Sequence, residues 1–414
     1  MTYGLIGERL GHSFSRIIQE YLTGEPYELR ELRPDELGAF LKSEPFRGIN
    51  VTIPYKQAVI PYLDELAPSA RLTGAVNVIL RSPEGRLTGH NTDFDGFLAM
   101  AATAGVPLEG SRVVILGAGG AAAAVEAAVR TAGASRVVFA VRHDFGPDRL
   151  PISDPSAFRD FDVVVNATPV GMYPDLKGKP LDISRMPNLR GVLDCVYNPI
   201  CTSLVLDALE RGIPAAGGLM MVVAQAVKAA GLFHSTVFPD GTVERVYKWL
   251  RSSRRNIVLT GMPSSGKTTV GKLLASRLGL RFADTDDVVR TFADSSIPEI
   301  FARQGEEGFR RLESVAIESL AGEQGLVIAT GGGAVLNPEN VRSLRQNGVL
   351  LFLDRDPGML RPTADRPLSG SRSELESLYI KRLPVYIKSA DCRISNDGTP
   401  EEAVERILTI IDKV

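Results

Sequence analysis

The chain has 414 residues, which is long for a single core and suits two or three domains of roughly 100–200 residues. Hydrophobic residues make up 44% and charged residues 23%, and the net charge of -2 excludes a strongly basic surface for nucleic acid or anionic membranes. The cysteines Cys195, Cys201 and Cys392 lack metal-ligand spacing and are odd in number. They argue against a disulfide framework and favour a reducing cytosol.

Apolar segments that direct export or membrane insertion are not expected in this chain. The first residues carry no basic segment followed by a long apolar stretch, as a signal peptide would. No run of about 18 apolar residues occurs, so we expect no membrane span. We therefore predict a cytoplasmic protein that binds neither nucleic acid nor membranes. The oligomeric state is left open, with a homodimer as one alternative.

Short β-rich runs alternate with helical patterns along the whole chain. This alternation predicts an α/β fold with mostly parallel sheets. The expected strands include residues 2–6, 48–53, 112–116, 136–141, 162–166, 256–259, 326–329 and 348–353.

Four short polar motifs lie within the first hundred residues. They are H-S-F-S at 12–15, N-V-T-I-P-Y-K at 50–56, G-A-V-N at 74–77 and N-T-D-F-D-G at 91–96. Ser13 and Ser15 alternate along the chain, so both hydroxyls could bond one carboxylate. A lysine such as Lys56 at a helix start is ordinarily a solvated surface residue, and only its motif favours a catalytic role.

A glycine-rich turn follows the buried-strand pattern at 113–116. The turn, G-A-G-G-A-A at 117–122, opens a long Ala-rich helix, which is typical of a dinucleotide pyrophosphate site; a tight turn without a ligand is the alternative. The next strand ends at Val141-Arg142-His143, where an acid would favour NAD and an arginine suits the 2′-phosphate of NADP. Arg142 therefore favours NADP, although Asp144 keeps NAD open.

Three more motifs follow: N-A-T-P-V-G-M at 166–172, D-C-V-Y-N-P at 194–199 and G-L-M-M-V-V-A-Q-A at 218–226. Over residues 1–250 the series resembles shikimate dehydrogenase. The resemblance implies that Lys56 and Asp93 form the catalytic pair, since reduction of a ketone requires a proton at the forming alkoxide. It implies substrate contacts from Ser13, Ser15, Thr52, Asn77, Asn91, Thr92, Tyr197 and Gln225. It implies NADP contacts from Gly117, Ala118, Gly119, Gly120, Ala121, Arg142, Thr168 and Met172.

The chain departs from that family in a few places. Arg16 and Val78 replace a usual proline and threonine, and Val141 and His143 flank Arg142 in place of a usual Asn and Thr. Residues 144–160 are rich in proline, so the crossover helix usual in the family is expected to be trimmed or irregular.

The expected domain order follows from these motifs. We predict a substrate-binding domain at 1–101, completed by a helix at about 236–250, and a Rossmann domain at 102–235 that binds NADP. A helix closes at residues 247–250, and the basic, polar residues 251–255 are expected to form a short linker. A fresh strand then begins a further domain at 256–414.

A phosphate-binding motif opens this last domain. The strand at 256–260 runs into G-M-P-S-S-G-K-T at 261–268, and residues 269–278 have the pattern of an amphipathic helix. Strand, glycine loop and helix are the context that a P-loop requires, so a chance match is disfavoured. Lys267 would reach the β- and γ-phosphates and Thr268 would bind Mg²⁺.

Five further motifs follow in order. Asp284-Thr285-Asp286 places two carboxylates on one side of an extended segment, where one could serve Mg²⁺ and the other the phosphoryl acceptor. F-R-R-L-E spans 309–313, G-G-G spans 331–333, R-P-L spans 366–368 and R-L-P-V-Y spans 382–386. A lone arginine is most often a surface ion-pair residue, so their roles depend on the whole series.

Together these motifs resemble shikimate kinase from residue 256 to 414, with Ser369 replacing a usual apolar residue. The resemblance implies that Asp286 is the base and that Asp284 and Thr268 place the metal. Shikimate would be bound by Asp286, Arg310, Gly331, Gly332, Gly333 and Arg382. ATP would be bound by Gly261, Ser264, Ser265, Gly266, Lys267, Thr268, Thr269 and Arg361. Arg366 would close from a lid onto the phosphates, with Lys267 also acting in catalysis.

The two implied reactions are consecutive. NADPH-dependent reduction of 3-dehydroshikimate would give shikimate, and Mg-ATP would then phosphorylate it to shikimate 3-phosphate, in aromatic amino acid biosynthesis through chorismate. Two alternatives stay open. One is a sensor that kept both ligand sites without turnover, and the other is an enzyme that uses quinate or NAD.

Overall fold

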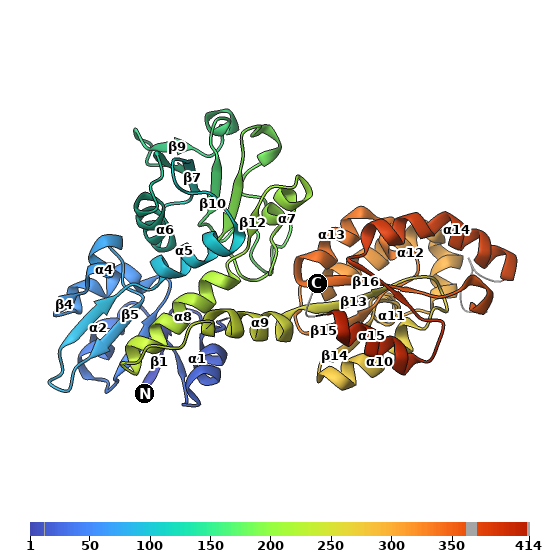
Figure 1. Cartoon of the computed structure of the whole chain (residues 1–414), viewed down its shortest axis with the longest axis horizontal. Helices are drawn as coiled ribbons and strands as arrows, with labels where there is room; N and C mark the ends of the chain where they lie inside the picture. Colours follow the sequence, from blue (N-terminus) through green and yellow to red (C-terminus); the bar gives the residue numbers. More distant parts are fainter. Residues whose placement is uncertain (12, 362–370, 412–414) are drawn as a thin grey trace. The chain divides into compact units, whose positions relative to one another are not determined.

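The computed structural model describes residues 1–11, 13–361 and 371–411. The chain divides into two compact units, Met1–Leu250 and Arg251–Val414, each of which is described by itself (Figure 1). Among the described residues, no helix combines the length and apolar character needed to cross a bilayer.

The first sheet is mixed, with strand order β2-β1-β3-β5-β6-β4. Its strands are β1 (Tyr3–Gly7), β2 (Glu28–Glu31), β3 (Gly48–Val51), β4 (Glu65–Leu66), β5 (Val78–Arg81) and β6 (Leu87–His90). The short helices around it are α1 (Ser15–Thr23), α2 (Leu37–Ser43), α3 (Tyr55–Ala58) and α4 (Pro68–Thr73), with a 3-10 turn at Ile60–Tyr62. Strand β5 runs antiparallel to β3 and β6, which brings residue 77 beside the end of β3.

The second sheet is entirely parallel, with order β12-β11-β10-β7-β8-β9. Its strands are β7 (Arg112–Leu116), β8 (Arg136–Val141), β9 (Arg149–Pro151), β10 (Val163–Asn166), β11 (Gly191–Asp194) and β12 (Ala215–Ala216). Helices α6 (Gly120–Thr131) and α7 (Ser203–Glu210) and the 3-10 turns Pro155–Phe158 and Ile183–Arg185 accompany it. The central strands are unbroken apolar runs because helices and turns cover both faces of a parallel sheet.

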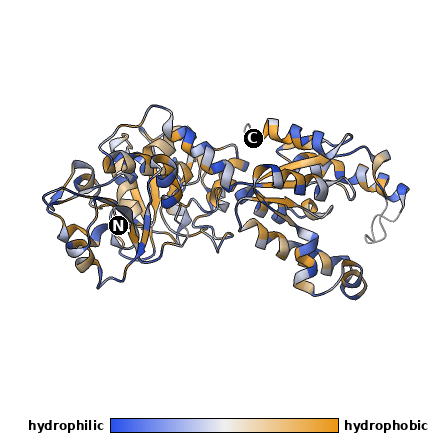
Figure 2. Ribbon diagram, turned by 90° about the horizontal axis from the view of Figure 1, so that it is seen from below, coloured by the Kyte–Doolittle hydropathy of each residue, from blue (hydrophilic) through white to orange (hydrophobic). Residues whose placement is uncertain are grey.

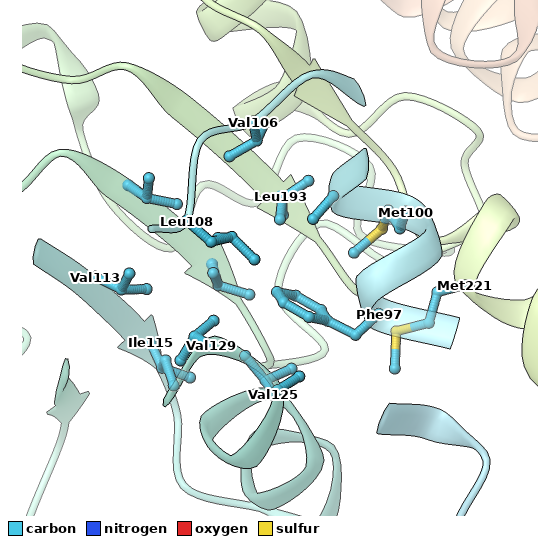
Figure 3. Packing of buried hydrophobic residues seen from close by; sticks show 14 of the residues in the cluster. Phe97, Met100, Val106, Leu108, Val113, Ile115, Val125, Val129, Leu193 and Met221 are labelled. Carbon is cyan, nitrogen blue, oxygen red and sulfur yellow. The ribbon is translucent and has the colours of Figure 1, made fainter. Parts of the chain in front are cut away.

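Three further helices are α5 (Asp93–Ala104), α8 (Leu219–Phe233) and α9 (Thr242–Arg254), and the last of these ends in the first residues of the second unit. Helix α5 packs on the second sheet, and Figure 3 shows Phe97 reaching from it into a cluster with Ile115 of β7 and Val125 of α6. Helix α8 packs against α5 and α1, and its Phe233 contacts Tyr3 of the first sheet. The two sheets of this unit are therefore joined through buried helices.

The second unit is built on a parallel sheet of order β14-β15-β13-β16-β17. Its strands are β13 (Asn256–Thr260), β14 (Arg281–Asp284), β15 (Leu326–Ala329), β16 (Gly348–Asp354) and β17 (Cys392–Ser395). Its helices are α10 (Lys267–Leu278), α11 (Thr285–Ala293), α12 (Ile297–Ala321), α13 (Pro338–Asn347), α14 (Arg372–Ser389) and α15 (Pro400–Ile410), with 3-10 turns at Ala334–Leu336 and Pro357–Met359. The central strands β13, β15 and β16 are apolar and buried by helices, and hydrophobic strands are visible within this unit in Figure 2.

The predicted α/β fold is confirmed, and each expected strand is present within a few residues. The trimmed crossover after β8 is also confirmed, since β9 and a 3-10 turn stand where a helix would lie. Two local expectations were wrong. Helix α9 runs to Arg254 and does not close at residue 250, and the second carboxylate of the Asp284–Asp286 pair lies on helix α11, not in an extended segment.

Candidate functional sites

An ion pair joins two sequence motifs of the first unit. Lys56, on α3 just after β3, donates from Nζ to Oδ2 of Asp93 at 2.6 Å. The side chains are 15% and 8% exposed, so the pair is shielded but still reachable. Asp93 is the first residue of α5, where the helix dipole favours a negative charge. This geometry keeps an ammonium donor fixed at a nearly buried position.

Asn77 holds the other oxygen of the Asp93 carboxylate. Its amide donates to Asp93 Oδ1 at 2.9 Å and to Thr92 Oγ1 at 3.0 Å, and its Oδ1 accepts from the Thr92 backbone at 2.8 Å. Thr92 Oγ1 lies 3.4 Å from Oε1 of Gln225 on α8. Predicted site residues from separate elements therefore gather around one carboxylate.

Asn91 has a different set of contacts. Its amide donates to Ala75 O at 2.9 Å, and its Oδ1 accepts from the backbone of Asp93 and Phe94 at the start of α5. Both ends of the carboxamide are therefore used inside the protein. The contact of Asn91 with substrate stays a prediction, because its observed role is to cap the helix that carries Asp93.

The remaining predicted substrate contacts include the H-S-F-S segment. Ser13 Oγ accepts from the backbone of Ser15 at 3.2 Å, and the ring of Phe14 lies 5.2 Å from that of Tyr197. Burial raises the pKa of the Tyr197 phenol, so its hydroxyl stays protonated and able to donate. Thr52 lies at the end of β3 against Gly7 of β1.

The glycine turn lies directly beside the predicted catalytic lysine. A Cβ at Gly120 would be 3.7 Å from the Lys56 side chain, and one at Gly117 would be 2.7 Å from the methyl of Thr168. Gly117 has a φ of 91°, which favours glycine. Helix α6 begins after Gly119 without a side-chain cap, so its first N–H groups can receive an anion. Ala118 lies in the same turn, and Ala121 lies on the first turn of α6.

Arg142 and Met172 follow two strands of the same sheet. Both side chains are exposed, and Arg142 forms no ion pair with any residue that the structure describes. Arg142 directly follows β8, which is the neighbour of the strand that leads into the glycine turn. In dinucleotide-binding folds the end of this neighbouring strand contacts the ribose phosphate.

The P-loop of the second unit wraps around the start of α10. Gly261, Ser264 and Gly266 have φ values of 144°, 62° and 92°, which turn the backbone N–H groups inward. Lys267 donates from Nζ to Gly261 O at 3.0 Å and to Met262 O at 2.8 Å. Ser265 Oγ is buried and has no hydrogen-bond partner in the described residues. The loop therefore has the form that receives phosphates, with Thr269 exposed on the first turn of α10.

Thr268 and Asp284 form the predicted metal pair. Thr268 Oγ1 donates to Asp284 Oδ2 at 2.9 Å, and Asp284 Oδ1 caps α11 by accepting from Asp286 N at 3.0 Å. A hydroxyl and a carboxylate side by side suit Mg²⁺, which binds few protein oxygens and completes its shell with water and phosphate. The residues present thus fit this ion.

The triple glycine runs between charged side chains. A Cβ at Gly331 would clash with Glu313 and lie 3.0 Å from Asp286 Oδ1, and one at Gly333 would clash with the Arg310 guanidinium. Arg382 donates to Gly332 O at 3.0 Å. Asp286, Arg310 and Arg382, predicted from three distant motifs, therefore meet around one glycine segment.

Glu313 orients one of these arginines. Its Oε2 accepts from Arg310 at 2.7 Å, and the residue is 1% exposed. Burial raises the pKa of the Glu313 carboxyl, while Arg310 opposes the rise. Tyr386 likewise donates to Gly332 O. The sequence predictions assigned neither residue a role, although each closes a motif that also carries a predicted arginine.

Two family models match this chain. One, for shikimate kinase, matches residues 263–412, and the other, for the substrate-binding domain of shikimate dehydrogenase, matches residues 5–79. A shikimate dehydrogenase (NADP(+)) of Clostridium perfringens strain SM101 is 32% identical over 266 residues, which cover 60% of this chain and 98% of the relative. The chain belongs to the shikimate dehydrogenase family. Both resemblances seen in the sequence are confirmed, and the chain combines a shikimate dehydrogenase with a shikimate kinase.

Other relatives and solved structures agree. A shikimate dehydrogenase (NADP(+)) of Geobacter sp. strain M21 is 41% identical over 219 residues, covering 48% of this chain and 74% of the relative. A chorismate mutase/shikimate 5-dehydrogenase fusion protein from Clostridium acetobutylicum superposes with a TM-score of 0.56 at 32% identity, covering 60% of this chain and 96% of that one. The shikimate 5-dehydrogenase of Thermus thermophilus, in complex with NADP(H) and shikimate, gives a TM-score of 0.51 at 31% identity, with 60% and 99% covered.

Part of the predicted kinase lid lies outside the described residues. Arg366 and Ser369 fall in residues 362–370, so their placement is not part of the site above. Arg361, the last described residue before that segment, is exposed, and its carbonyl accepts from Ser264 Oγ of the P-loop at 2.8 Å. The predicted adenine contact Arg361 is therefore hydrogen-bonded through its backbone to the nucleotide loop.

Proposed function

We propose that this shikimate dehydrogenase and shikimate kinase catalyse consecutive steps: NADPH-dependent reduction of 3-dehydroshikimate, then Mg-ATP-dependent phosphorylation of the shikimate formed. The carrying observation is the Lys56–Asp93 ion pair beside the glycine turn, because it brings a proton donor next to the expected cofactor site. Relatives named for NADP(+) and the exposed Arg142 support NADPH over NADH.

In the first reaction NADPH supplies the hydride. The Lys56 ammonium donates a proton to the ketone oxygen as negative charge develops there. Asp93, held by Asn77, keeps the ammonium oriented. Ser13 and Ser15 bind the substrate carboxylate, and Tyr197 lines the pocket. In this scheme the nearly buried Asn77 and Asp93 orient the donor, and the more exposed Lys56 transfers the proton.

In the second reaction the chain's own groups hold the acceptor and neutralise phosphate charge. Asp286 accepts the proton of the 3-hydroxyl, while Arg310 and Arg382 bind the carboxylate of shikimate, a bidentate pairing suited to guanidinium. Thr268 and Asp284 would hold Mg²⁺, which would supply positive charge to offset the charge of the phosphates. Lys267 would exchange the carbonyls of Gly261 and Met262 for phosphate oxygens.

A single-pot assay on the purified full chain tests the proposal. We would supply 3-dehydroshikimate and NADPH with and without Mg-ATP, and follow NADPH loss and shikimate 3-phosphate. We expect NADPH loss in both mixtures and the phosphate ester only with ATP. Lys56→Met and Lys267→Met are matched controls that should each remove one product-forming step. Binding of saturating ligands without either product would refute the enzyme assignment and favour a sensor.

A further inference from the structure

A buried carboxyl group lies at the end of β11. Asp194 is 0% exposed. Its Oδ1 accepts from the backbone N–H of Val196 at 2.9 Å and from the Asn166 amide at 2.9 Å, and its Oδ2 accepts from the Thr202 hydroxyl at 2.6 Å. Burying an acid is unfavourable unless its oxygens are satisfied. The three donors are the last residue of β10, the loop that follows β11 and the N-cap of α7.

One of those bonds leads to the loop expected to bind NADPH. Asn166 is paired with Asp194 across the parallel strands β10 and β11. Its Oδ1 accepts from the backbone and hydroxyl of Thr168 at 3.0 and 2.6 Å, and its amide also reaches Val170 O at 3.2 Å. Thr168 in turn packs its methyl against Gly117 of the glycine turn. The carboxyl group is thus linked through one amide to the cofactor loop.

The other two bonds hold the loop that carries Tyr197. Val196, which donates to Asp194, is the residue before Tyr197. Thr202 caps α7 by accepting from Val205 N at 3.3 Å, so its hydroxyl can both donate to Asp194 and anchor the helix. A Cβ at Gly171 would be 3.6 Å from Thr202, which places the far end of the cofactor loop against the same residue.

We propose that Asp194 is a positioning residue of the dehydrogenase: by fixing Asn166 it holds Thr168 against the glycine turn, and so it sets the affinity for NADPH. This inference rests on the proposed function of the first unit. Asp194 touches neither expected ligand and acts through Asn166. Its loss therefore affects NADPH binding more than binding of the ketone substrate, because apart from Tyr197 the expected substrate contacts come from residues 13–92 and from Gln225 of α8.

The test compares Asp194→Ala, Asn166→Ala and the conservative Asp194→Asn in the full chain. An asparagine at 194 can keep its oxygen towards Val196 and Asn166 and turn its amide to Thr202, whose hydroxyl also accepts. We expect both alanine variants to raise the KM and Kd for NADPH about tenfold or more, since they leave buried donors unpaired. The KM for 3-dehydroshikimate of both alanine variants should stay within about twofold of the wild-type value. Asp194→Asn should bind NADPH with an affinity close to that of the wild type.

Two controls separate positioning from folding. Shikimate phosphorylation by the second unit measures the concentration of full-length chain in every preparation. Asp182→Ala is the second control, because Asp182 is an exposed aspartate of the first unit that caps a 3-10 turn. Unchanged NADPH binding in Asp194→Ala overturns the proposal. So does an equal loss in the affinities for both ligands, or a failure of Asp194→Asn to restore binding.

NADPH binding is measured through the fluorescence of NADPH and does not require turnover. This test can therefore fail or succeed independently of the activity assay for the proposed function. If the wild type binds NADPH without reducing 3-dehydroshikimate, the proposed reaction fails while the Kd comparison still decides the role of Asp194. If the wild type binds no NADPH, both proposals fail.

Discussion

The buried Asp194 should make the first unit less stable as the pH rises through neutrality. Burial raises the pKa of this carboxyl to about 7 from its ordinary 3.8, against the opposing hydrogen bonds from Thr202, Val196 and Asn166. The folded chain therefore binds a proton that the unfolded chain has released. The stability is fully present below about pH 3.8 and is lost as the pH rises through about 7. At about 1.4 kcal/mol per pH unit the whole loss is about 4 kcal/mol, of which about 3 kcal/mol falls between pH 5 and pH 8.5.

Asp194→Asn isolates this effect because it removes the titration and keeps the shape. We expect the free energy of unfolding of the variant, relative to wild type, to rise by about 3 kcal/mol between pH 5 and pH 8.5. Urea unfolding followed by Trp249 fluorescence is the assay. Trp249 is the one tryptophan of the chain and stacks on Tyr21 at 3.9 Å, so it reports on the first unit.

The exposed Asp182 provides the control. Hydrogen bonds from Ser184 lower the pKa of its carboxyl, so Asp182→Asn should leave the difference from wild type constant above pH 5. A difference between wild type and Asp194→Asn that is also constant from pH 5 to 8.5 would refute the reasoning. It would mean that the three hydrogen bonds outweigh burial and that the carboxylate is ionised throughout.

The remaining predictions separate the two activities. Lys56→Met should lower kcat for NADPH oxidation by about 10²–10⁴-fold with no change in shikimate phosphorylation, and assays of both products in one preparation check this; a loss under tenfold would count against proton donation by Lys56. Arg142→Ala should raise the KM for NADPH but not that for NADH, because only NADPH carries the 2′-phosphate; equal changes for both cofactors would contradict the role. Glu313→Gln should raise the kinase KM for shikimate by about tenfold and leave that for ATP unchanged, because Arg310 loses its buried counter-charge; initial rates with each substrate varied decide it.

Local patterns determined much of this protein before any fold was known. The strand, glycine loop and helix at 256–278 and at 112–131 follow from apolar runs and glycine spacing, since each element depends on neighbours within a few residues. The order of the motifs indicated both families, and the prolines at 144–160 predicted that the crossover there lacks a regular helix. These features are encoded over short stretches, so the sequence alone carries them.

The tertiary structure decided which side chains meet. Lys56 and Asp93 form an ion pair although they are 37 residues apart in the sequence. Asp194 and Asn166 are 28 residues apart and form a hydrogen bond because they are register partners on the neighbouring strands β11 and β10. Glu313 reaches the triple glycine only because α12 packs beside β15. Hydrogen bonds and buried charges of this kind depend on strand order and helix packing, which local periodicity does not encode. The sequence alone therefore predicted the two chemistries, while the packing of distant elements set the geometry that supports them.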